Sequence, residues 1–157
     1  MNEFTAKKLG EVLAFAIVGK EIFEKGNEAL GQVLTPEGVG QIIERVNGHI
    51  NTITDLAANK GTTGITLPKS EKTSEKLRKM LGLYVGDEWD NSAELLEWLG
   101  FFEGAALVHW KLVEGAGQSL SDDGLKELAK IGVDFHHNLL TQVSEAIRDL
   151  GGKKATA

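Results

Sequence analysis

The chain lacks cysteine altogether and has no long apolar run in its 157 residues. Without cysteine, disulfide bonds, thiolate metal sites and cysteine nucleophiles are excluded. The apolar run of the N-terminal segment, residues 13–18, is closed by Gly19 and the charged Lys20. A spanning helix needs about 20 apolar residues, and a signal peptide needs a cationic start before its apolar run. We therefore expect neither a membrane anchor nor a signal peptide.

Positive charge is also in short supply. Lysine and arginine number 17 against 23 acidic residues, which gives a net charge of −6. A nucleic-acid partner needs clustered cations, so none is expected. Glycine-rich phosphate loops, the Gly-x-Ser-x-Gly element and His-Glu-x-x-His are all absent from the sequence. The composition is typical of a soluble globular protein, for which a cytoplasmic location is expected, and it leaves open whether the protein is an enzyme.

Apolar residues recur at three- and four-residue steps along most of the chain, which predicts an all-α protein. One helical domain is expected over residues 1–152, followed by a disordered tail over 153–157. The predicted elements are four long helices and one short helix, at 4–33, 36–60, 70–83, 90–118 and 121–150. Residues 61–69 are predicted to form a loop.

Nineteen glycines accompany only two prolines, and many of the glycines fall inside predicted helices. Each costs a helix about 1 kcal/mol relative to alanine, so close helix packing is expected to compensate. We expect that packing above all at Gly100 and Gly104, which share one helix face.

Short turns join the first two long helices and the last two, so each pair is predicted to be an antiparallel hairpin. The segment 61–89 is long enough to cross back along the bundle. A four-helix bundle with one long crossover resembles the ferritin-like arrangement in element order. A globin-like helical domain is the alternative, although no histidine lies between residues 61 and 90 to bind haem.

Three of the four histidines lie on apolar helix faces, among them His49 and His136. When each hairpin is folded about its turn, at 1.5 Å per residue, His49 lies level with Glu21 and His136 lies level with Glu103. The sequence therefore predicts a mid-bundle cluster of Glu21, His49, Glu103 and His136.

Carboxylates and imidazoles inside a bundle are suitable ligands for iron, manganese or zinc. The Glu-x-x-His pairs of dinuclear bundle sites are absent, so a mononuclear site, or a degenerate bundle that has lost its metal, fits better than a dinuclear site. Two alternatives stay open: His136 is simply hydrogen-bonded to Glu103 as part of the core, or the cluster lines an organic-ligand or haem pocket.

Large aromatic residues also lie off the main apolar face of the 90–118 helix. Trp98 and Phe101 indicate a second buried surface. The crossover helix would cover it, or else a second subunit would, which makes the protein a homodimer. The function classes that follow are a bundle that binds a metal ion or small ligand, and a non-catalytic interaction or sensor domain that self-associates through exposed aromatic helix faces.

Overall fold

The computed structural model consists of helices joined by short connections, and it describes residues 1–157 except for the side chain of residue 36. Within that description there are six helices and no strand. The helices are α1 Glu3–Lys25, α2 Asn27–Leu34, α3 Pro36–Asn59, α4 Thr63–Val85, α5 Ser92–Leu120 and α6 Asp123–Ala155. None of the helices in the described part of the chain combines the length and apolar character needed to cross a bilayer.

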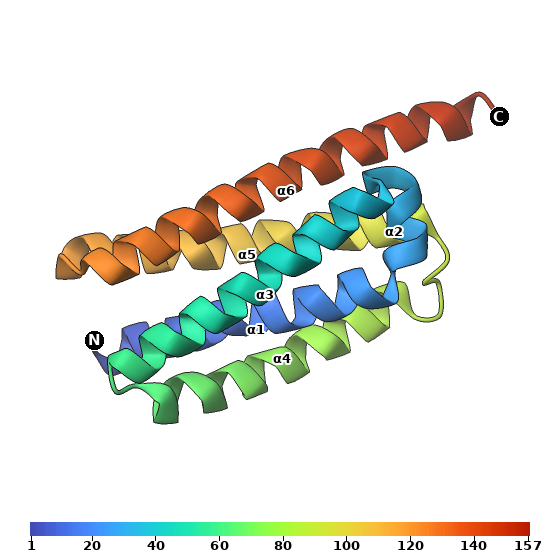
Figure 1. Cartoon of the computed structure of the whole chain (residues 1–157). Coiled ribbons are helices and arrows are strands. Elements are labelled where there is room, and N and C mark those ends of the chain that lie inside the picture. The colour runs from blue at the N-terminus through green and yellow to red at the C-terminus, as the bar shows by residue number, and fades with distance from the viewer.

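The five long helices form a bundle in which each runs antiparallel to the next along the chain (Figure 1). α1 lies inside this arrangement and packs against α3, α4 and α5, whereas α6 packs mainly against α5. The predicted all-α fold is confirmed, with five long helices in place of the four that were expected. Its nearly aligned helix axes favour a bundle over the globin-like alternative, in which helices cross at about 50°. The ferritin-like order stays a prediction.

The connection between the second and third predicted long helices is the main correction. Residues 61–69 were expected to form a loop and 70–83 a short helix, but α4 begins at Thr63 and includes Pro68. Proline removes one backbone donor from a helix interior. Here packing against α1 compensates, since the Thr66 hydroxyl donates to the Ala6 carbonyl across 3.1 Å. The predicted crossover is thus a helix of the bundle.

Two helix ends also differ from the prediction. The helix expected over 4–33 breaks at Gly26, where a Cβ would lie 3.1 Å from both the Ile22 carbonyl oxygen and a Leu95 methyl group. A side chain would be tight at this position, so glycine suits the turn from α1 into α2 beside α5. At the other end, α6 continues through Gly151 and Gly152 to Ala155 instead of ending before them.

The close-packed glycines are not the ones expected. A Cβ on Gly100 or Gly104 would meet nothing within 4 Å, so the prediction of tight packing there was wrong. Contact occurs instead at Gly10 and Gly132. A Cβ on Gly10 would lie 2.5 Å from the Thr66 carbonyl oxygen of α4, and one on Gly132 would lie 2.3 Å from the Trp110 ring.

The buried apolar side chains form two clusters along the bundle. One cluster lies toward the α2 end and includes Phe23, Leu95 and Phe102. The other lies toward the opposite end and includes Ile53, Trp110 and Leu125. Buried polar side chains occur near the level at which the two clusters meet, and these side chains form the candidate site.

Candidate functional site

A buried carboxylate–imidazole pair joins α5 to α6 at mid-bundle. Glu103 is 1% exposed and His136 is 3% exposed, and Glu103 Oε2 lies 2.5 Å from His136 Nδ1. The short α5–α6 turn sets the alignment that brings the two side chains together. In that turn Ser121 adopts a left-handed conformation, and the Asp122 carboxylate caps α6 by accepting from the Leu125 N–H. The predicted hydrogen bond between His136 and Glu103 is confirmed.

His49, on α3, lies next to this pair but does not bond to it. Its ring centroid is 6.3 Å from that of His136, and it meets the Phe135 ring edge-on at 4.8 Å. The side chain is buried, and its Nδ1 has no hydrogen-bond partner among the described residues. We call His49, Glu103 and His136 the buried polar cluster. The fully buried Trp110 indole lies beside it, with its ring stacked 6.4 Å from His136.

Burial makes the charged form of His49 unfavourable. It lowers the pKa of His49 from its ordinary value of 6.5 to about 4, and the nearby charges of His136 and Arg45 act in the same direction. His49 is therefore neutral in the folded protein at neutral pH.

The depressed pKa of His49 predicts a loss of stability in mild acid. Below pH 6.5 the unfolded chain binds a proton at His49, whereas the folded chain binds one only near pH 4. The contribution of His49 to the free energy of unfolding is largest above pH 6.5. It decreases as the pH falls toward 4, by up to about 3 kcal/mol. Urea unfolding at several pH values between 7 and 4 measures the effect.

The matched variant for this experiment is His49→Leu, which removes the titrating group and keeps an apolar side chain against Phe135. Carboxylates contribute acid sensitivity to both proteins. The difference between the two unfolding free energies isolates the histidine. If both proteins lose stability equally between pH 6.5 and 4, the titration of His49 is not the cause.

Glu21 is the predicted site residue that the structure does not bring to the cluster. It lies on the exposed side of α1, where its two carboxylate oxygens accept from Arg78 of α4 at 2.6 and 3.0 Å. That contact raises the pKa of Arg78. The alignment about the first predicted turn assumed one unbroken helix over 4–33, whereas the chain breaks at Gly26 between α1 and α2.

The metal prediction gains no support from this geometry. Among the described residues, no group of three or more His, Cys, Asp or Glu side chains is placed to hold an ion. Within the buried polar cluster, Nδ1 of His136 is already bonded to Glu103. A site for iron, manganese or zinc at Glu21, His49, Glu103 and His136 stays a prediction.

A second polar contact was not anticipated from the sequence. Glu11 of α1 is mostly buried and faces His109 of α5, with 3.9 Å between Glu11 Oε2 and His109 Nε2. Lys8 and Lys69 lie 3.0 and 3.5 Å from the other carboxylate oxygen. His109 Nδ1 also lies 2.7 Å from the Ala105 carbonyl oxygen. No turn links α1 to α5 directly, so no alignment along the sequence could pair these residues.

The outer surface of α4 and α5 exposes large apolar side chains. Leu83 is 89% exposed, Val108 67% and Phe101 63%, and Met80 and Leu112 also reach solvent. We call these five residues the α4–α5 apolar face. The sequence had marked Phe101 as lying off the main apolar face, whereas the exposure of Met80 and Leu83 near the end of α4 was not anticipated.

A hollow of about 320 Å³ lies within this face. Met80, Leu83 and Tyr84 of α4 line one side of it, and Trp98 and Phe101 of α5 line the other. The Tyr84 ring packs against both aromatic rings of α5, with centroid distances of 5.7 Å to Trp98 and 5.4 Å to Phe101. Trp98 is thereby buried under α4, as expected if the crossover helix covers it, whereas Phe101 is left open.

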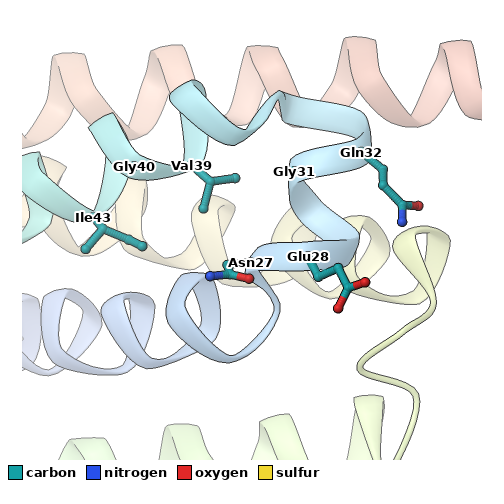
Figure 2. Close-up of a pocket in the computed structure, with 7 residues that line it drawn as sticks. All are labelled: Asn27, Glu28, Gly31, Gln32, Val39, Gly40 and Ile43. Atoms are coloured by element: carbon teal, nitrogen blue, oxygen red, sulfur yellow. The ribbon is translucent and has the colours of Figure 1, made fainter.

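A larger hollow of about 510 Å³ lies between α2 and α3. Figure 2 shows Val39 and Ile43 reaching into the space below α3, while Glu28 and Gln32 point outward from α2. Glu28 is the only ionisable side chain among the residues that line it. This hollow therefore offers little chemistry, and the buried polar cluster and the α4–α5 apolar face are the stronger candidates.

Comparisons with known proteins add no family to this description. A scan against protein-family models finds no match, and searches among curated proteins and among solved structures find none either. The functional argument rests on the residues and geometry given above.

Proposed function

We propose that this protein is an interaction domain that self-associates through the α4–α5 apolar face. The observation that carries the proposal is the apolar hollow at which Met80, Leu83 and Phe101, each more than half exposed, meet across α4 and α5. Single exposed apolar residues are ordinary on protein surfaces, but contiguous ones mark interaction sites. Apolar and aromatic residues that keep large areas in water gain most from being covered by a partner.

The electrostatics of this surface are compatible with a protein partner. The Tyr84 hydroxyl is protonated at neutral pH and able to donate, and burial together with Glu97 and Glu94 raises its pKa further. Apolar side chains at the centre with polar groups at the edge are typical of protein interfaces. The net charge of −6 argues against a nucleic-acid partner.

Sedimentation of the purified protein over a wide concentration range tests the proposal. The protein is expected to dimerise, and the double variant Leu83→Glu/Phe101→Glu is expected to sediment as a monomer, because association would desolvate two unpaired carboxylates. The matched control is Ile131→Glu. Ile131 is also an exposed apolar residue, but it lies on α6 in a hollow shared with α3. A wild-type monomer at every concentration contradicts the proposal, as does a loss of association in the control.

A further inference from the structure

The exposed surface of α5 follows one face of the helix for most of its length. Glu97, Gly104 and Lys111 succeed one another at seven-residue spacing, and Phe101 and Val108 repeat the same spacing beside them. Seven residues make nearly two full turns, so residues at this spacing share a face. Gly104 is half-buried, whereas the other four side chains are exposed. The Tyr84 ring of α4 meets this face at Phe101, whereas Glu97, Val108 and Lys111 are exposed.

Four residues on this side of α5 have the spacing of a hole that can take a side chain from another helix. Glu97, Gly100, Phe101 and Gly104 have the i, i+3, i+4, i+7 spacing of the four-residue holes between packed helices. Two of the four corners are glycine, and a Cβ on either would meet nothing within 4 Å. Because two corners carry no side chain, the hole is deeper than one bounded by four side chains. A partner helix can reach it.

The side chain that fits this hole is present on the same helix. Val108 is 67% exposed and lies one turn beyond Gly104. In an antiparallel pair of α5 helices related by a two-fold axis at Gly104, Val108 of each copy lies level with Gly100 of the other. Each valine then enters the hole of the other copy. The same patch serves on both copies, as a two-fold interface requires.

The charged residues of the face select the same alignment independently. Glu97 and Lys111 lie equally far from Gly104 in opposite directions, about 10.5 Å along the helix. A two-fold axis at Gly104 therefore places Glu97 of each copy opposite Lys111 of the other. A parallel pairing in register would place Glu97 against Glu97 and Lys111 against Lys111, which is repulsive.

The existing partner of Lys111 does not oppose this arrangement. Lys111 Nζ lies 2.9 Å from Glu114 within α5, in a pair that is largely exposed. Exposed pairs contribute little to stability, so the ammonium group can turn toward a second carboxylate without appreciable loss.

From this geometry we infer that the partner is a second copy of the chain, packed α5 against α5 in antiparallel orientation about a two-fold axis at Gly104. Val108 of each copy fills the hole formed by Glu97, Gly100, Phe101 and Gly104 of the other, and Glu97 pairs with Lys111. This inference rests on the proposed self-association and adds its axis and alignment. The apolar hollow beside Phe101 lies at the edge of the same interface.

Charge reversal tests the pairing. Glu97→Lys and Lys111→Glu each convert two attractive contacts per dimer into repulsive ones, so each is expected to weaken dimerisation about tenfold. The double variant Glu97→Lys/Lys111→Glu restores the pairs and is expected to return the dissociation constant close to that of the unmodified protein. All these positions are exposed, so circular dichroism should show unchanged helices. If the double variant loses as much dimerisation free energy as the two single variants together, the proposed pairing is wrong.

Cross-linking tests the orientation, and the absence of native cysteine makes it direct. Glu97→Cys and Lys111→Cys are prepared separately, mixed and oxidised. A disulfide between copies is expected in the mixture and not in either variant alone, because two copies of residue 97 lie about 21 Å apart along the helices, beyond the reach of a disulfide. Disulfides within either variant alone overturn the antiparallel orientation. A dimer in sedimentation without the mixed disulfide overturns the inference while the proposed function stands, and a wild-type monomer removes both.

Discussion

Replacement of Glu103 by leucine is expected to reduce the free energy of unfolding by about 3–5 kcal/mol. The variant removes the acceptor that lies 2.5 Å from His136 Nδ1 and leaves that imidazole without a partner in a site that is 3% exposed. A buried polar group that loses its only partner carries its full desolvation cost. Urea unfolding at neutral pH measures the loss, which is a large share of the 5–15 kcal/mol typical of a whole domain.

Two further variants separate the cost of an unpaired group from the value of the pair. Glu103→Leu/His136→Leu replaces both partners by apolar side chains and is expected to be within about 1 kcal/mol of the unmodified protein, because removing both partners leaves no polar group unpaired. Glu21→Leu breaks the exposed contact with Arg78 and is expected to cost less than about 1 kcal/mol. If Glu103→Leu costs no more than Glu21→Leu, the buried pair does not hold α5 against α6.

Replacement of Gly132 by alanine is expected to be the most damaging single-methyl change in the chain. The added Cβ would lie 2.3–2.5 Å from three atoms of the Trp110 ring. Trp110 is fully buried and cannot turn outward, so α6 would have to move away from α5. Overpacking of this kind costs about 1–3 kcal/mol or more, and the shift would also strain the neighbouring bond between Glu103 and His136. Thermal and urea unfolding report the loss.

Gly48→Ala is the matched control for this change. Gly48 is also a helix-interior glycine, on the exposed side of α3, and a Cβ there meets nothing within 4 Å. Alanine is preferred over glycine in a helix by about 1 kcal/mol, so this variant is expected to be more stable than the unmodified protein. Opposite signs for the two substitutions identify the contact with Trp110, and not helix propensity, as the cause. A stabilising Gly132→Ala would show that the indole can move aside.

The features that the sequence predicted correctly are those set by short connections between neighbouring helices. A short turn sets the alignment of the two helices it joins, which is why Glu103 could be matched to His136 across the α5–α6 turn. The same procedure failed for Glu21. Its side chain points to Arg78 of α4, a partner that is distant in the sequence. Counting residues from a turn works where both helices are unbroken, as α5 and α6 are, and it fails across the first hairpin, because the chain breaks at Gly26 between α1 and α2.

The first turns of α4 were missed because local signals and tertiary packing disagree there. Residues 61–69 contain glycine, threonine and proline, all of which favour a loop. In the folded protein the contact of Gly10 with the Thr66 carbonyl oxygen places α4 directly on α1. Helical structure in that segment is supported by packing that periodicity in the segment itself does not reveal. The same limit explains why the small residues at Gly100 and Gly104 indicated close packing but not that their face is left open.

The buried Glu103–His136 pair, which lies between the two apolar clusters, affects the alignment of α6 along α5. Helices with uniformly apolar cores can slide past one another by one turn, about 5.4 Å, because one aliphatic side chain then replaces another. Such a slide of α6 along α5 would carry both polar groups into purely apolar surroundings and leave each without its partner. Every slipped bundle therefore costs several kcal/mol more than the native one. The pair therefore favours the native alignment of α6 along α5 over alignments displaced by one turn.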